Sequence, residues 1–277
     1  MKNIYILFIG FLIILASCET ESDASGLFDA EELTVIQGFI SPQAEMIVIE
    51  VARSEPRFGN NNSLFEDFVI PDAEVRIKNE DSVEIVLPFN AGTRQYEIST
   101  ETFKIISGES YALEVTVDGK RFTATCQVPE NTVDIISSEV AEKDQDFNSV
   151  NIRFKDVENI RNFYVAGFNF PTSGFQNAEV QNLFITDTNK NGNIISSSVD
   201  YDTFNIRTDT IISYTVRLAN VEPILFDYLK AVSNDTGFES PFLEPIVYPT
   251  NIKGDKSFGI FAGFTESEKK ASYDPRN

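Results

Sequence analysis

A loop between two predicted strands carries oxygen side chains at the spacing that suits a hard cation. In residues 187–193 the oxygen-bearing side chains alternate with other residues, and Gly192 stands at the sixth position, as in an acidic calcium loop. Ser198 occupies the twelfth position, where such a loop needs a bidentate acid. An ordinary turn between strands is the alternative. The candidate calcium ligands are Asp187, Asn189, Asn191 and Asp200.

The thiol of Cys18 is the second group whose surroundings suggest chemistry. It ends the quartet Leu-Ala-Ser-Cys at 15–18, after a basic start and an apolar run of about a dozen residues. That run is too short to span a bilayer core of about 30 Å and is typical of a secretory signal. The quartet resembles a bacterial lipobox, which predicts lipidation of Cys18, for example with palmitate, and a membrane anchor. An ordinary cleaved signal with a cysteine near the cut is the alternative.

The composition excludes several kinds of site. The chain has no histidine, so Ser-His-Asp and Cys-His nucleophiles are excluded and the commonest ligand of zinc, copper and iron is missing. Acidic residues number 43 against 22 basic ones, and a net charge of −21 disfavours nucleic acid as a partner. With Cys18 used for lipid, Cys126 cannot form an intramolecular disulfide, and its place in an alternating strand predicts a buried thiol. We therefore expect no enzyme activity and no cofactor apart from the calcium candidate.

Aromatic residues flank the polar stretch 171–174. Rings that face solvent there would form a patch for a protein partner or an apolar ligand, whereas rings that face inward would belong to the core. The sequence leaves both alternatives open. The candidate binding residues are Phe168, Phe170 and Phe175.

The elements that must position these groups are mostly β-strands. Short alternating segments at regular spacing over residues 33–130 predict an immunoglobulin- or transthyretin-like β-sandwich, with a tight hairpin at Asp118-Gly119. Residues 131–277 predict a second antiparallel β-rich domain with strands at 183–186, 210–218 and 258–264. One short helix is expected, with a first turn at 221–223 and a stop at 234–237. Its core face carries Leu225, Tyr228, Leu229 and Val232. The predicted division is a signal at 1–17, a lipidated flexible tether at 18–32, and the two domains at 33–130 and 131–277.

Several landmarks together resemble the Bacteroidota outer-membrane lipoproteins grouped as the domain-of-unknown-function 4249 family. The resemblance covers nearly the whole chain after the signal, and it implies no assigned activity and no catalytic residues. It also implies companionship with TonB-dependent outer-membrane receptors. Besides the quartet at 15–18, the landmarks lie at 35–41, 70–75, 108–111, 226–229, 241–245, 251–254 and 258–264.

These observations predict a non-enzymatic lipoprotein of the outer membrane that serves as an accessory or binding subunit of an envelope complex, with a TonB-dependent receptor as partner. The acids Glu19, Glu21 and Asp23 resemble an export signal, which favours the cell surface over the periplasmic face. A surface glycan-binding protein or carboxylate-based hydrolase, with a calcium-supported cleft in residues 131–277, is the alternative. A structural or adhesion subunit is a third.

Overall fold

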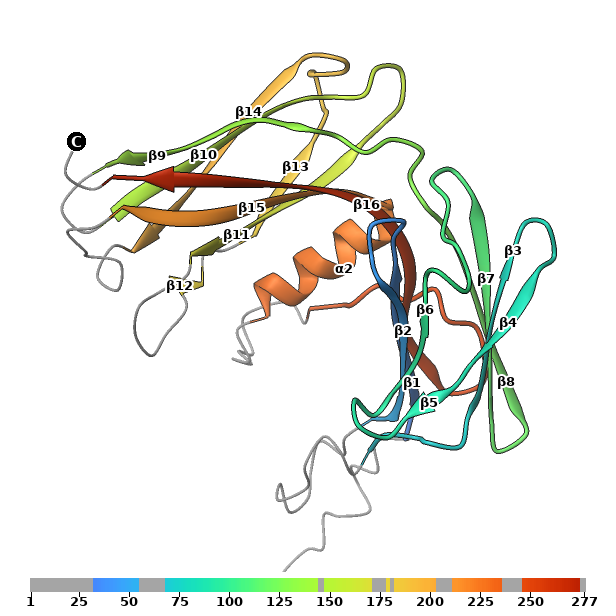
Figure 1. The fold of residues 1–277 in the computed structure, drawn as a ribbon. Helices are drawn as coiled ribbons and strands as arrows, with labels where there is room; N and C mark the ends of the chain where they lie inside the picture. The colour runs from blue at the N-terminus through green and yellow to red at the C-terminus, as the bar shows by residue number, and fades with distance from the viewer. Residues whose placement is uncertain are drawn as a thin grey trace, which may run out of the picture. The chain divides into compact units, whose positions relative to one another are not determined.

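The protein is mostly β-strand in the computed structural model, which confirms the predicted fold class (Figure 1). One helix is present among the residues that the structure describes. The described residues are 32–54, 68–143, 147–170, 178–179, 182–202, 211–235 and 246–274.

Two layers of strands enclose the first hydrophobic core. One layer is an antiparallel sheet of order β4-β3-β7-β8, and the other contains β1, β2, β6 and β5. Inward positions alternate with exposed ones, so Val75, Leu113 and Phe122 from the first layer meet Ile36 and Ile49 from the second. The strands are β1 (Thr34–Ile40), β2 (Met46–Arg53), β3 (Glu74–Asn79), β4 (Glu84–Leu87), β5 (Phe89–Asn90), β6 (Gln95–Ser99), β7 (Ser110–Val117) and β8 (Lys120–Gln127).

A second core is built by later strands. An antiparallel sheet of order β14-β10-β9 contributes Phe154, and the strands β11 and β15 contribute Tyr164, Phe170 and Tyr214. The elements are β9 (Ile135–Glu142), β10 (Phe147–Lys155), β11 (Phe163–Phe170), β12 (Ala178–Glu179), β13 (Leu183–Thr186), β14 (Ile194–Asp202), β15 (Ile212–Val221), α2 (Pro223–Asn234) and β16 (Ser257–Tyr273).

The last strand, β16, belongs to the same sheet as the first. Residues 257–263 pair in parallel with β1, and residues 264–273 pair antiparallel with β15 (Figure 1). One sheet therefore runs in the order β12-β11-β15-β16-β1-β2-β6-β5, with β13 also paired to β11. Ile252 and Phe261 pack in the first core. The division of the chain at residue 130 stays a prediction, because strand pairing links the two segments through β16.

The predicted hairpin and helix are both present. Asp118 and Gly119 form the turn between β7 and β8 with φ values of 50° and 76°, the left-handed conformation that a tight hairpin requires. Helix α2 begins at Pro223, whose missing N–H costs nothing in a first turn. Leu225 and Phe226 are buried, and Val232 at the far end of the predicted core face is 46% exposed.

Buried tyrosines fix the loops that precede the strands. The hydroxyl of Tyr96 accepts a hydrogen bond from the Ala73 N–H and donates to the Ile70 carbonyl, each at 2.7 Å. Tyr111 near the start of β7 accepts from the Ile106 N–H at 2.7 Å, and burial raises its pKa to about 12. Each ring packs in the core while its hydroxyl satisfies loop backbone groups.

Candidate functional site

The most connected polar site joins two loops, residues 156–162 and 187–193, at one end of the second core. Its centre is Asp156, which follows β10 and is 3% exposed. The carboxylate accepts hydrogen bonds from the Tyr164 hydroxyl at 2.6 Å, the Gly192 N–H at 2.8 Å and the Asn162 side-chain amide at 3.2 Å. Burial, followed by the bond to Asp156, raises the pKa of Tyr164, so this hydroxyl stays protonated as a donor.

Three of the four predicted calcium ligands lie in the second of these loops. Asp187 is 7% exposed and its carboxylate accepts from the backbone N–H of Asn162 at 3.0 Å. The side-chain oxygen of Asn191 accepts from the Asn159 N–H at 2.8 Å, and Asn189 makes the turn with φ of 62°. The two buried acids and Asn191 thus satisfy N–H and O–H groups of the neighbouring loop.

Asp200 does not join this loop. It lies on β14 opposite Ser149 and forms an ion pair with Lys143 at 2.5 Å. Six residues of extended strand separate it from Ile194, a distance of roughly 20 Å. The prediction that Asp200 joins the ligands of the 187–193 loop is therefore wrong, because residues 194–200 form a strand and do not continue the loop. No group of three His, Cys, Asp or Glu side chains poised for a metal occurs in the described ranges, and calcium binding by the loop itself stays a prediction.

The aromatic candidates are core residues where the structure describes them. Phe168 is 8% exposed and Phe170 is fully buried. The Phe170 ring stacks on Tyr214, with ring centroids 4.8 Å apart and planes 18° from parallel. Phe175 lies outside the described residues. Of the two alternatives, the inward one applies to Phe168 and Phe170, because their strand β11 has hydrogen-bonded neighbours on both edges and packs against the second core.

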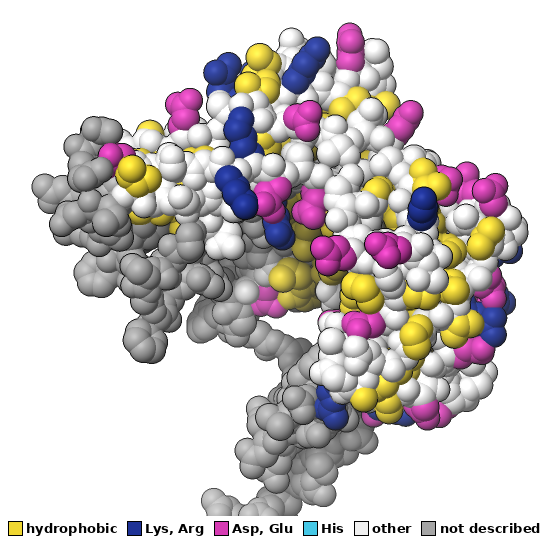
Figure 2. Space-filling model, viewed as in Figure 1, with side chains coloured by type: hydrophobic (Ala, Val, Ile, Leu, Met, Phe, Trp, Pro, Cys, Tyr) yellow, Lys and Arg dark blue, Asp and Glu magenta, His cyan; other side chains and the backbone are white. Residues whose placement is uncertain are grey.

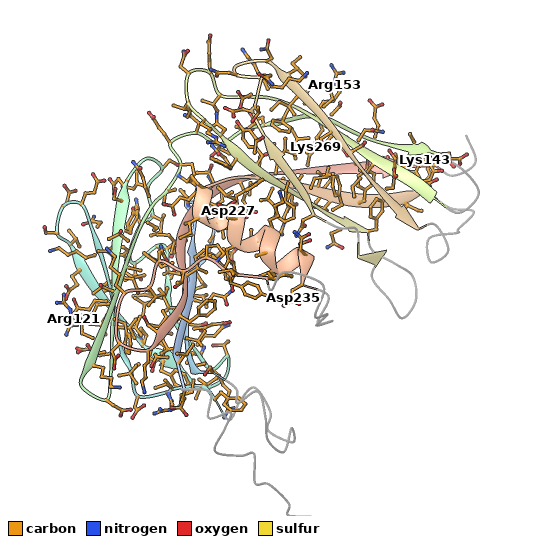
Figure 3. The ribbon with its side chains drawn as sticks, turned by 180° about the vertical axis from the view of Figure 1, so that it is seen from behind. Arg121, Lys143, Arg153, Asp227, Asp235 and Lys269 are labelled. Atoms are coloured by element: carbon orange, nitrogen blue, oxygen red, sulfur yellow. The ribbon has the colours of Figure 1, made fainter. Side chains whose placement is uncertain are left out.

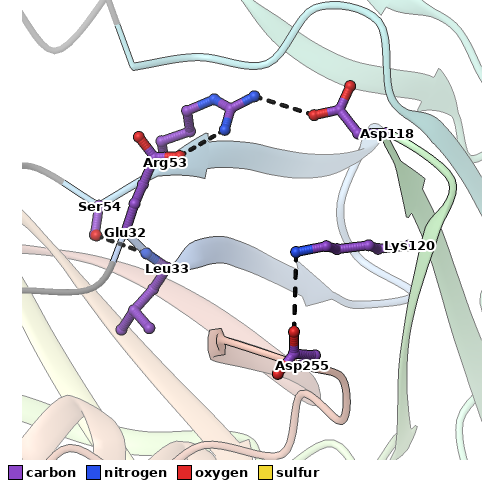
Figure 4. Close-up of polar contacts among 7 residues, drawn as sticks. All are labelled: Glu32, Leu33, Arg53, Ser54, Asp118, Lys120 and Asp255. Carbon is purple, nitrogen blue, oxygen red and sulfur yellow. Dashed lines mark hydrogen bonds and ion pairs between the residues drawn. The ribbon is translucent and has the colours of Figure 1, made fainter.

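The root of the predicted tether is held at the start of β1 (Figure 4). Leu33 donates its N–H to the Ser54 hydroxyl at 2.9 Å, and the Ser54 N–H donates to the Leu33 carbonyl at 2.8 Å. Arg53 bridges Glu32 at 2.5 Å and Asp118 at 3.2 Å. These ion pairs are exposed, so each contributes at most about 1 kcal/mol. Cys18 lies outside the described residues.

Glu222 joins three elements that are distant in the sequence. Its carboxylate, at the residue before α2, accepts from the Gly263 N–H of β16 at 2.7 Å and from the Gln127 N–H of β8 at 2.8 Å. Burial raises the pKa of Glu222, and the two N–H donors act in the opposite direction. Its role is structural, since both oxygens bind backbone groups.

Sequence reasoning missed Asp156, Asn162, Tyr164 and Glu222. The only available signal was an acid directly after an alternating strand, as at Asp156, or directly before a helix, as at Glu222. Neither position reveals which distant N–H group the carboxylate meets.

The face of the molecule shown in Figure 2 has no region of a single charge sign. Acidic and basic side chains are interspersed on the face shown in Figure 2. Helix α2, the one helix within the described ranges, falls short of the length and apolar character that crossing a membrane requires.

Comparison with known proteins identifies the family of the chain. No curated protein matches the chain. The family model described as "Domain of unknown function (DUF4249)" matches residues 19–270, which is nearly all of the sequence after the predicted signal. The chain therefore belongs to the DUF4249 family.

Proposed function

We propose that this protein is a lipid-anchored outer-membrane lipoprotein of Bacteroidota that acts, without chemistry of its own, as a binding or accessory subunit of an envelope complex. The observation that carries the proposal is the quartet at 15–18, which lies just before a body whose first strand is held on both edges. Cys18 carries the acyl chains, and residues 19–31 connect it to Glu32.

The first strand suits an anchor point. β1 is paired with β2 on one edge and with β16 on the other, over six and seven residue pairs. A pull from the membrane along β1 loads these ladders in shear, because their hydrogen bonds run across the strand direction. Lys120 and Asp255, 3.9 Å apart, add a link between β8 and the loop before β16. This exposed pair contributes at most about 1 kcal/mol, so the two ladders of β1 bear most of the load.

The polar groups of the site support a binding role better than catalysis. The carboxylates of Asp156, Asp187 and Glu222 all accept hydrogen bonds from the protein itself. A general acid or a nucleophile would have to present its oxygen to a substrate instead. We therefore assign the function to surface contacts, with a TonB-dependent receptor as the proposed partner and the cell surface as the proposed location.

Labelling with a palmitate analogue in the native host tests the anchor. We expect the wild type and Cys126→Ala to incorporate the label and to fractionate with membranes, and Cys18→Ala to do neither. Cys126→Ala is the matched control, because it removes the other cysteine of the chain. Incorporation of label by Cys18→Ala, or an unlabelled wild type, would refute the anchor.

Purification from gently solubilised membranes tests the partnership. A tagged wild-type protein should recover a β-barrel receptor, identified by mass spectrometry, under several mild detergents. The Cys18→Ala variant should recover much less of it, because it no longer shares the membrane. Recovery of the lipoprotein alone in every detergent would refute the partnership and leave the anchor standing.

Protease added to intact cells tests the proposed location. Degradation of the protein would place it on the cell surface, and protection would place it in the periplasm.

A further inference from the structure

The outer face of the β4-β3-β7-β8 sheet contains a hollow of about 400 Å³. It lies on the side of the sheet opposite the first core, because Lys78, Ala112 and Thr125 in its lining alternate with buried residues along β3, β7 and β8. The core residues Leu113 and Ala124 also border it. Arg121 marks this outer face in Figure 3.

Strand register explains why the face is hollowed there. Lys78 pairs with Ala112, and Ala112 pairs with Thr125, so a methyl group stands between longer side chains. In the next outward row, Glu114 pairs with Thr123, and Thr123 pairs with Lys253 through an isolated bridge. Ala112 therefore forms the floor, and charged side chains from β3, β8 and Lys253 form the walls.

The charge of the lining is opposite to that of the protein. Four cations and two acids line the hollow, whereas the whole chain has a net charge of −21. Arg76 pairs with Glu84 at 2.5 Å and Arg121 pairs with Glu114 at 2.5 Å, so each acid of the lining already has a guanidinium partner. Arg76 also pairs with Glu74, which stands beside the hollow.

The two lysines supply the remaining positive charge. Among the residues that the structure describes, the ammonium groups of Lys78 and Lys253 have no ion pair or hydrogen bond. Their backbones are three strand spacings apart across the sheet, about 14 Å, because β7 and β8 lie between them, and they are offset by two residues along the strands, about 7 Å. Two flexible ammonium groups therefore reach over the floor from opposite walls.

We propose that this hollow binds a small polycarboxylate, with one carboxylate on Lys78 and another on Lys253. Ligand hydroxyl groups would meet the side chains of Thr123 and Thr125 on the floor. A single compact anion contacts only one wall, so two separated carboxylates are the better fit. The negative charge of the rest of the protein repels anions, which confines their binding to this place.

Isothermal titration calorimetry of the full-length protein in neutral detergent tests the proposal, with citrate as the probe and inorganic phosphate as a compact anion. We expect saturable citrate binding that the Lys78→Ala/Lys253→Ala variant weakens by about tenfold or more, because each lysine gives a charge-assisted hydrogen bond. Ala112→Gln should weaken citrate binding equally by filling the floor without changing the charge. Lys155→Ala, which removes an exposed lysine of β10, is the matched control and should change the affinity by less than about twofold.

Four results would overturn the proposal. They are no saturable heat with citrate, citrate affinity unchanged in Lys78→Ala/Lys253→Ala, an equal loss of affinity in Lys155→Ala, and phosphate binding as tight as that of citrate. Far-UV circular dichroism verifies the folding of each variant. If Ala112→Gln does not fold, the double lysine variant still decides, because both of its sites are exposed.

Discussion

Gly259 is the position at which one added methyl group should do most damage. It lies in β16 opposite Ile36 of β1, with φ of +122°, a conformation that favours glycine. A Cβ built there would stand 1.9 Å from the Ile36 carbonyl oxygen and 2.8 Å from its carbonyl carbon. These are backbone atoms, so the clash cannot be relieved by turning a side chain. Gly259→Ala must therefore push β1 and β16 apart.

The cost follows from the local packing. Strain at the backbone angle accounts for about 1–3 kcal/mol. Separation of the strands also disturbs the fully buried Ile36 and Phe261, so the total should reach about 3–5 kcal/mol. For a chain of this size, each 1 kcal/mol lowers Tm by about 2–4 °C, so a drop on the order of 6–20 °C is expected.

Thermal and urea unfolding followed by far-UV circular dichroism measure this loss. Gly92→Ala is the matched control, because the nearest atom to its added Cβ is the Asn90 side-chain oxygen at 3.2 Å, in an exposed turn. The control should stay within about 0.5 kcal/mol of the wild type. A Gly259→Ala protein as stable as this control would refute the close approach of β1 and β16.

Three further predictions concern buried groups. Asp156→Ala leaves the Tyr164 hydroxyl and the Gly192 N–H without their acceptor, so the free energy of unfolding should fall by about 2–5 kcal/mol in urea titrations. The control Asp200→Ala, which breaks an exposed ion pair, should lower it by less than about 1 kcal/mol. Equal losses in the two variants would contradict the structural role of Asp156. Burial raises the pKa of Glu222 above its ordinary 4.5, so its contribution to stability is full below that value and is lost as the pH rises through the folded-state pKa. The free energy of unfolding of the wild type, relative to Glu222→Gln, should therefore decrease as the pH rises above the ordinary value of 4.5, and a constant difference would disprove it. Cys126 is 4% exposed and burial raises the pKa of its thiol, so iodoacetamide should label it only after unfolding in urea. Mass spectrometry locates the label. Rapid labelling of Cys126 in the native protein would contradict its buried position.

Local sequence patterns correctly predicted the secondary-structure elements that depend on neighbouring residues in the chain. The hairpin of β7 and β8 follows from alternation around Asp118-Gly119, and α2 follows from Pro223 and an apolar face. The strand predicted at 183–186 coincides with β13 for the same reason. The buried position of Cys126, also predicted from alternation, is confirmed.

Features that depend on distant partners were missed. The strand predicted at 258–264 extends to Tyr273, although its second half is polar, because β15 pairs with it throughout. Lys269 in that half donates to the Ile135 and Ile136 carbonyls of β9, a contact that composition alone does not reveal. The hydrogen bonds to Asp156 likewise join loops more than thirty residues apart. Aromatic side chains such as Phe168 and Phe170 are compatible with burial and with binding, and the neighbours of β11 decide between the two.

The pairing of the first strand with the last has a consequence for biogenesis. β1 obtains one of its two neighbours only after the ribosome has made residues 257–263, more than 200 positions later. Neither hydrophobic core is complete before that point, since β16 contributes to both sheet segments. Non-local pairing of this kind slows folding and keeps the nascent chain open. A chain that folds late can still pass through a translocon in an unfolded state. This order of folding is therefore compatible with export across a membrane.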